Sequence, residues 1–270
     1  MTDRALVSII IPTYNSQNTI AFCLESIKSQ TYEPIEVIVV DGGSEDRTVE
    51  ICENYSVSVI ETDLGMAASR VKGAEISKGE FLLHVDSDME LSQHVVQECV
   101  NSMDSYDALI IPEVNTGETY WAKCTDVGKK VSRQKNVGHL RFLSNELYFK
   151  LGGHNPKLLY KEDLEFHMLV ESSGENIGHI SSEIQHHLGK TRLIDLFNHR
   201  LKYMRSIDQY KKNRRVEYTP SNDGNCSTWE VIIEDMRNRP KLVVGYIFIS
   251  FITAIISNYY KFKFNYWNYS

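Results

Sequence analysis

The chain has 270 residues, 42% of them hydrophobic and 24% charged, which is enough for one large α/β domain and excludes a collagenous or low-complexity protein. Its five cysteines are scattered without a C-x-x-C pair, which argues against a zinc knuckle or redox couple and favours reduced thiols. The net charge of −7 argues against a nucleic-acid binder, yet residues 1–189 carry 15 Lys+Arg and 29 Asp+Glu, whereas residues 190–270 carry 14 and 7.

The first 85 residues alternate between strand-like and helix-like patterns. Residues 5–12 form a β-branched apolar run that ends at Pro12, which is typical of a strand buried on both faces. A helix follows, which Asn15 or Ser16 can cap. The cycle then repeats, with strands expected over residues 35–40, 57–61 and 80–85 and helices over residues 44–55 and 66–77. This alternation with short connections predicts an α/β fold in which helices cover a mainly parallel sheet.

Beyond residue 100 the pattern is less regular. Residues 109–112 are a further strand candidate and residues 123–135 a polar, basic stretch, whereas residues 161–172 and 192–213 have helical periodicity. Residues 218–225 contain proline and glycine, which predicts a loop or linker. We therefore expect a basic helical region to follow the sheet domain.

The chain ends in an apolar segment with basic flanks. Residues 242–260 contain no charge, and at about 1.5 Å per residue they just reach the length that spans a bilayer. Glycine, serine, threonine and asparagine dilute the apolarity of this segment, so a buried or interfacial helix is the alternative. Because the surrounding region is basic, we expect it to contact a membrane surface.

Polar, mostly acidic residues follow three of the predicted strands. Thr-Tyr-Asn at 13–15 follows the first, Asp-Gly-Gly-Ser-Glu-Asp at 41–46 the second, and Asp-Ser-Asp at 86–88 the fourth. Since ligands bind outside the carboxyl ends of strands in an open parallel sheet, these segments should converge on one crevice. The helix expected from Ser44 would point its N-terminal amides at the ligand. The dinucleotide-binding and P-loop glycine patterns are absent, which argues against both kinds of site.

Asp86 and Asp88 are alternate residues at the mouth of an apolar strand. Carboxylate oxygens in this position suit Mg²⁺ or Mn²⁺, which can bridge a nucleotide diphosphate. An isolated Asp-x-Asp is more often a solvated turn, but its place directly after residues 81–85 favours metal binding. We therefore expect a divalent cation as cofactor.

Five motifs stand in order along the chain: VSIIIPTYN (residues 7–15), VVDGGSEDRT (39–48), ASRVKG (68–73), DSD (86–88) and EDL (162–164). Their order and spacing resemble the family 2 glycosyltransferases, which are inverting enzymes with the GT-A fold. The resemblance covers about residues 6–215. It implies that the base and ribose pocket is lined by Pro12, Thr13, Tyr14 and Asn15, and that Asp41 contacts the nucleobase or ribose. It also implies that Arg70 supports the nucleotide. Asp86 would face the ribose or donor and the metal, and Asp88 would bind the metal.

Two positions depart from the family pattern. A second Asp is usual where Gly42 stands, and an Asn is usual where Val71 follows Arg70. Both changes remove a polar side chain from the donor pocket. We expect them to affect donor selectivity more than reaction type.

The acidic pair Glu162 and Asp163 resembles the family's acceptor-side segment, which carries the catalytic base. A sugar hydroxyl is a poor nucleophile at neutral pH, so a carboxylate within hydrogen-bond reach must take its proton during attack on the anomeric carbon. We expect Asp163 to be this base and Glu162 to be a neighbouring orienting group. Acids that merely complement a helix N-terminus are the alternative.

Two consecutive histidines follow the acidic pair along the chain. Of His186 and His187, we favour His187 for completing the metal shell or holding the pyrophosphate, with a satisfied or exposed histidine as the alternative. We also expect Lys190 and Arg192 to reach the leaving phosphates.

The resemblance therefore implies a metal-dependent inverting transferase that moves a sugar from a nucleotide diphosphate sugar to an acceptor hydroxyl, on a lipid-linked glycan or a polysaccharide. A polyprenyl-phosphate glycosyltransferase is the first alternative, because an ionised phosphate acceptor needs no base. A silent nucleotide- or membrane-binding module is the second. Because nucleotide sugars are chiefly cytoplasmic, we expect the catalytic domain on the cytoplasmic face of a membrane.

The expected boundaries are a GT-A domain over 1–215 (a nucleotide-sugar half, 1–100, and an acceptor half, 101–215), a linker or helix over 216–241, the apolar helix over 242–260 and a tail over 261–270.

Overall fold

The computed structural model describes residues 4–135, 138–217 and 227–267, with side chains as far as residue 260. In this part of the chain the main sheet has seven strands in the order β3-β2-β1-β4-β8-β6-β9. The strands are β1 (Val7–Thr13), β2 (Ile35–Asp41), β3 (Ser58–Glu61), β4 (Phe81–His84), β6 (Ala108–Ile110), β8 (Leu140–Ser144) and β9 (Ile177–His179). Four of the six strand pairs are parallel, so the prediction of a mainly parallel sheet is confirmed.

Strand β1 is the centre of the core, and all seven of its residues are buried. Its side chains alternate between the two faces of the sheet, as the pleat requires. Ile9 and Ile11 pack in one apolar cluster with α1 (Ile20–Lys28) and α4 (Val95–Ser102). Ile10 packs in a second cluster with residues of α3 (Met66–Ile76), α6 (Asn145–Lys150) and α7 (Glu162–Ser172). A strand with helices on both faces explains the unbroken apolar run in the sequence.

Two predicted helix starts in this half are wrong. Helix α1 begins at Ile20 with Thr19 at its N-cap, so neither Asn15 nor Ser16 caps it. Helix α2 (Thr48–Glu53) begins four residues later than the expected start at Ser44. In both places the polar residues after the strand instead build loops at the edge of the sheet.

The two halves expected over 1–100 and 101–215 share the main sheet, because β8 pairs with β4. A second sheet of three strands has the order β5-β10-β7, from β5 (Met89–Leu91), β10 (Ile184–His187) and β7 (Glu113–Thr116). It brings the segment after Asp88 beside the two histidines. The stretch recognised only as polar and basic is part of helix α5 (Tyr120–Gln134), which packs on β7 and buries Ala122, Cys124 and Val127.

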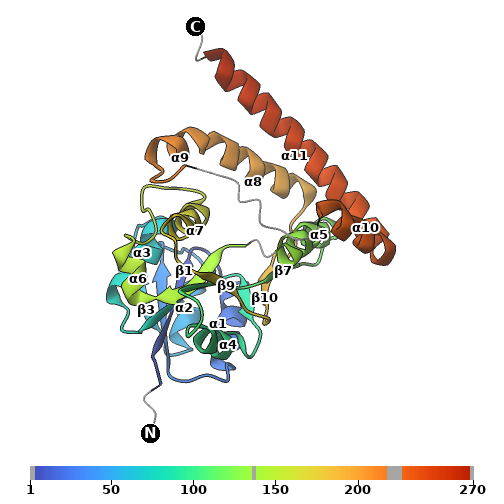
Figure 1. Ribbon diagram of the computed structural model, residues 1–270. Coiled ribbons are helices and arrows are strands. Elements are labelled where there is room, and N and C mark those ends of the chain that lie inside the picture. Colours follow the sequence, from blue (N-terminus) through green and yellow to red (C-terminus); the bar gives the residue numbers. More distant parts are fainter. Residues whose placement is uncertain (1–3, 136–137, 218–226, 268–270) are drawn as a thin grey trace.

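The C-terminal region is helical, as expected. It contains α8 (Leu193–Arg205), α9 (Ile207–Asn213), α10 (Thr228–Asn238) and α11 (Pro240–Trp267). Ser206 separates α8 from α9, which the sequence predicted as one helix. Figure 1 shows α11 leaving the α/β body near α5 and α10. The expected tail is helical as far as Trp267, while the linker over 218–225 and Cys226 lie outside the described residues.

Residues 240–260 of α11 form a helix that is long and apolar enough to cross a membrane. Only 17% of its most apolar 18-residue window is buried within the structure. The alternative of a buried helix is therefore not met, whereas an interfacial helix and a membrane span both remain. Four of the five cysteines, Cys23, Cys52, Cys99 and Cys124, are buried free thiols, which agrees with the prediction of reduced thiols.

Candidate active site

A cleft of about 680 Å³ opens at the carboxyl ends of β1, β2 and β4. The register aligns Thr13 with Asp41 across β1 and β2, so these strand ends meet at one edge. Of the predicted donor-side residues, five line the cleft: Pro12, Thr13, Tyr14, Asp86 and Asp88. The convergence predicted from the three motifs is thus observed.

Asp41, the last residue of β2, is not among the residues that line this cleft. It is fully buried, and its carboxylate accepts hydrogen bonds from the backbone N–H groups of Gly43 (3.0 Å) and Ser44 (2.7 Å) and from the Ser44 hydroxyl (2.5 Å). Gly43 has φ +84°, a conformation that favours glycine. The backbone N–H groups of Gly43 and Ser44 therefore hydrogen-bond to Asp41. The sequence had predicted that N–H groups at this place would point at the ligand.

Asn15 is likewise not among the residues that line the cleft. Its backbone φ is 50°, its N–H donates to the Ser44 hydroxyl (2.8 Å), and its Oδ1 accepts from the Glu45 N–H (2.9 Å). These two hydrogen bonds join the end of β1 to the loop after β2. Asn15 and Asp41 thus both hydrogen-bond to Ser44.

Asp88 faces His186 across the small sheet. The distance from His186 Nε2 to Asp88 Oδ2 is 3.1 Å, and both residues line the cleft. His187 points to the other side of β10, where its ring lies 2.7 Å from Glu90 and 3.1 Å from the Thr116 hydroxyl. Successive side chains of a strand point to opposite faces. The structure therefore places His186, and not the predicted His187, beside Asp88.

Asp86 is held between two arginines. Arg70 Nη2 donates to its Oδ1, and Arg141 Nη2 lies 3.4 Å from its Oδ2. Burial raises the pKa of Asp86, but the positive charges of Arg70 and Arg141 lower it by a larger amount. The pKa therefore falls to about 2. Its charge is thus compensated within the protein, which disfavours the predicted role as a metal ligand. Among the described residues, no group of three or more His, Cys, Asp and Glu is arranged to hold a metal.

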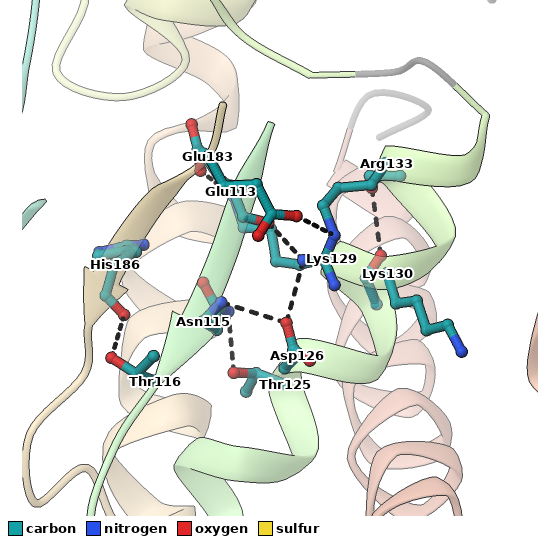
Figure 2. Close-up of polar contacts among 12 residues, drawn as sticks. Glu113, Asn115, Thr116, Thr125, Asp126, Lys129, Lys130, Arg133, Glu183 and His186 are labelled. Carbon is teal, nitrogen blue, oxygen red and sulfur yellow. Dashed lines mark hydrogen bonds and ion pairs between the residues drawn. The ribbon is translucent and has the colours of Figure 1, made fainter. Parts of the chain in front are cut away.

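Arg141 belongs to a buried ion-pair group that the sequence did not reveal. It makes two hydrogen bonds to Glu113 Oε1, of 2.6 and 2.8 Å, and one of 3.2 Å to the His84 carbonyl oxygen. Lys129 pairs with the other Glu113 oxygen, and Arg133 Nη1 donates to the Glu113 carbonyl oxygen (2.6 Å). Figure 2 shows Lys129 and Arg133 reaching from α5 toward β7. This group connects α5, β7 and β8 to Asp86.

Replacement of Glu113 by Gln is expected to lower the free energy of unfolding by about 3–5 kcal/mol, because Arg141 and Lys129 lose a buried partner. Urea unfolding measures the change. The matched control is Glu50→Gln in the exposed pair Arg47–Glu50, which should leave stability unchanged. Equal effects of the two substitutions would show that the buried group does not stabilise the fold.

The acidic pair lies at the start of α7, and its members differ in environment. The Glu162 side chain is buried, with its Oε1 3.9 Å from Arg70 Nε. Asp163 is about one-third exposed, and its Oδ2 lies 3.4 Å from His139 Nδ1. Arg70 therefore stands between Asp86 in the cleft and the acceptor-side pair. Of the two carboxylates, Asp163 is the one that an outside hydroxyl reaches more easily.

The pKa of Glu162 gives a pH-dependent prediction. Burial and the charge of Asp163 raise this pKa from its ordinary 4.5 to about 7, although Arg70 opposes them. The protonated form is therefore favoured by folding, and its stabilisation is lost as the pH rises from about 4.5 to about 7. Glu162→Gln mimics the protonated form. We expect it to raise the melting temperature relative to wild type more at pH 8 than at pH 5.

Thermal unfolding of both proteins at the two pH values measures this difference. The control is Glu171→Gln, at an exposed position near the end of the same helix. It should shift the melting temperature equally at both pH values. A pH-independent difference for Glu162→Gln would contradict the raised pKa.

The chain is similar in sequence to known glycosyltransferases. The model of the family described as Glycosyl transferase family 2 matches residues 8–155. An uncharacterized glycosyltransferase of Haemophilus influenzae is 32% identical over 178 residues, which cover 60% of each chain. The poly(ribitol-phosphate) beta-glucosyltransferase of Bacillus spizizenii is 30% identical over 168 residues, which cover 58% of this chain and 25% of that protein. The chain thus spans 60% or less of the length of these curated relatives.

Two solved structures share the fold over most of this chain. The mannosyltransferase PcManGT of Pyrobaculum calidifontis, in complex with GDP-Man and Mn²⁺, has a TM-score of 0.62 at 17% identity and covers 90% of this chain and 74% of its own. Residues 1–349 of S. aureus TarS, in complex with UDP-GlcNAc, have a TM-score of 0.56 at 17% identity and cover 92% and 73%. At this identity the likeness concerns the fold alone.

Proposed function

Because this chain belongs to glycosyl transferase family 2 and has the GT-A fold, we propose that it transfers a sugar from a nucleoside diphosphate sugar to an acceptor hydroxyl, with inversion and with the help of Mg²⁺ or Mn²⁺. The observation that carries the proposal is the cleft in which Asp88 and His186 lie opposite each other beside the β1 end. Its volume of about 680 Å³ is typical of small-molecule sites. The exposed Tyr14 ring offers a surface on which a base can stack.

The residues of the cleft fit a divalent cation. Asp88 Oδ1 and His186 Nδ1 are both buried and have no hydrogen-bond partner among the described residues. Carboxylate oxygen and imidazole nitrogen suit Mn²⁺, and Mg²⁺ is commonly bound by one or two carboxylates together with substrate phosphates. Asp88 and His186 would hold the ion. When bound, it supplies neutralisation of the charge that develops on the leaving diphosphate.

Asp163 is the proposed base. It takes the proton of the acceptor hydroxyl while that oxygen forms a bond to the anomeric carbon, and the bond from this carbon to the diphosphate breaks with its electron pair leaving on the diphosphate. Attack from the side opposite the leaving group inverts the anomeric centre. Glu162 and Arg70 would position this carboxylate relative to the donor cleft.

The acceptor is proposed to be a lipid-linked glycan or a polysaccharide. The name of the Bacillus spizizenii relative indicates a phosphate-containing polymer for that protein. A polyprenyl-phosphate acceptor is the second candidate, and the exposed apolar helix α11 favours it. Association with the cytoplasmic face of a membrane fits both acceptors, because residues 190–270 combine this helix with 14 Lys+Arg against 7 Asp+Glu.

A donor screen tests the proposal. The purified chain is incubated with a panel of uridine, guanosine and thymidine diphosphate sugars, with Mn²⁺ or Mg²⁺, and nucleoside diphosphate release is measured with and without candidate acceptors. We expect release from one nucleotide class and stimulation by an acceptor. Binding of a nucleotide without any release would favour the silent module.

A further inference from the structure

Helix α11 has two faces of different character. On one face Val243, Ile249 and Ser257 are buried against the rest of the protein. The other side carries six large apolar side chains, each 44–64% exposed: Val244, Ile247, Phe248, Phe251, Ile255 and Tyr259. Phe248 lies at the margin of this side, with its ring centroid 5.8 Å from that of Trp121 on α5. These six residues, called here the α11 stripe, form one continuous side of an α-helix because its repeat is 3.6 residues.

The buried face of α11 is fixed on α5. A Cβ atom at Gly245 would lie 2.3 Å from Cys124 Sγ and 2.6 Å from Tyr120 Oη, so the two helices are at their closest possible approach there. The Tyr120 hydroxyl donates to the Lys241 carbonyl oxygen (2.6 Å). Arg239, just before the helix, donates from Nη1 to Asp126 Oδ2 (2.9 Å). Apart from Phe248 at its margin, the stripe therefore lies on the side of α11 that faces away from α5.

A second attachment lies far along the same helix. Arg200 of α8 donates from Nε (3.1 Å) and Nη2 (2.6 Å) to the Ser257 hydroxyl. Since an α-helix rises about 1.5 Å per residue, Ser257 lies about 24 Å along the axis from Lys241. If α11 crossed a bilayer upright from Lys241, Arg200 and the adjoining part of α8 would be carried across most of a hydrocarbon core of about 30 Å. A charged side chain there is costly, so crossing requires α11 to detach from α8.

We propose that α11 lies in the plane of the membrane interface, with the stripe inserted among the lipids of an anionic leaflet and α8 on the water side. The excess of basic residues over 190–270 identifies an anionic bilayer as the partner. On α8, Lys202 and Arg205 are exposed and contribute to this charge. The inference deepens the proposed membrane association and rests on it. According to this inference, α11 inserts only one of its sides into the membrane and lies parallel to the membrane plane. It does not cross the bilayer.

The depth of the stripe in the bilayer tests this geometry. Single cysteines are introduced in the full chain at Val244, Phe251 or Tyr259, in a Cys226→Ser background, since the other four cysteines are buried. Each is labelled with an environment-sensitive fluorophore and bound to vesicles of phosphatidylcholine and phosphatidylglycerol. Quenching by lipids spin-labelled at different depths is then measured. We expect the same shallow depth at all three positions. A clearly greater depth at Phe251 than at the two ends would overturn the proposal and indicate a span.

A substitution on the stripe provides the second test. Phe251→Asp is expected to weaken binding to the same vesicles about tenfold or more, because a buried aromatic side chain is lost from the lipid. The control is Phe149→Asp, which changes a 47% exposed phenylalanine on α6 and should leave vesicle binding unchanged. Unchanged binding in both variants would overturn the proposal. So would a Phe251→Asp protein whose molar mass in solution is half that of wild type, because the stripe would then be covered by a second copy.

Failure of this inference is distinguishable from failure of the proposed transferase activity. Nucleoside diphosphate release with a water-soluble acceptor does not require the stripe, so Phe251→Asp should retain it. Loss of vesicle binding with retained release supports the membrane role. A chain that binds vesicles through the stripe but releases no nucleotide would instead overturn the transferase proposal alone.

Discussion

Asp88→Ala is expected to lower sugar transfer by about 10² or more while the protein remains folded, because a cation beside the leaving diphosphate contributes several kcal/mol to the rate. Asp88 Oδ1 is buried without a hydrogen-bond partner among the residues described, and Asp88 Oδ2 lies 3.1 Å from His186 Nε2. Chelation with EDTA should abolish transfer, and added Mn²⁺ should restore it. Full activity in EDTA would contradict the metal requirement.

Matched variants separate the metal site from the general charge of the small sheet. Glu90→Ala removes a carboxylate two residues from Asp88, but one that faces His187. It should retain transfer and its dependence on Mn²⁺. His186→Ala should weaken Mn²⁺ binding, measured by the electron paramagnetic resonance of the free ion, whereas His187→Ala should not. The opposite result for the two histidines would restore the original prediction of His187.

Asp163→Asn is expected to lower turnover by about 10² or more with little change in donor affinity, which is the usual effect of removing a general base. Asp163 is the more exposed member of the acidic pair, and its oxygen lies near His139. Turnover and nucleotide-sugar binding are measured separately. The control Glu171→Gln changes an exposed carboxylate on the same helix and should leave both quantities unchanged.

The result also discriminates between acceptors. A phosphate acceptor is already ionised, so its transfer should be far less sensitive to Asp163→Asn than transfer to a hydroxyl. If donor affinity fell while turnover held, Asp163 would belong to the donor site. In that case the assignment of the base would be wrong.

The sequence predicted the donor edge well because its signals are local. The apolar run of β1 and the polar residues directly after β1, β2 and β4 are contiguous segments, and topology alone brings such strand ends together. The loop after β2 was less predictable. Whether the amides near Ser44 face a ligand or Asp41 depends on the conformation of Gly43, which no periodicity reveals.

The residues that the second half of the chain brings to the site were less predictable, because their contacts are distant in sequence. The choice between His186 and His187 depends on which residues of β10 face the cleft. This strand has only four residues, too few to show an alternation of apolar and polar side chains. Arg141 and Glu113 are separated by 28 positions, and neither belongs to a motif. An arginine inside the apolar run Leu140–Leu143 was the one available signal, since a buried charge requires a partner.

The position of Arg70 makes the two halves of the site thermodynamically linked. The same guanidinium donates to Asp86 in the cleft and lies 3.9 Å from Glu162 on the acceptor side. A ligand that draws Arg70 toward the cleft removes positive charge from Glu162 and so favours its protonation. By reciprocity, a proton on Glu162 must favour that ligand by the same free energy. If the donor acts on Arg70 in this way, its binding should be accompanied by net proton uptake near pH 7.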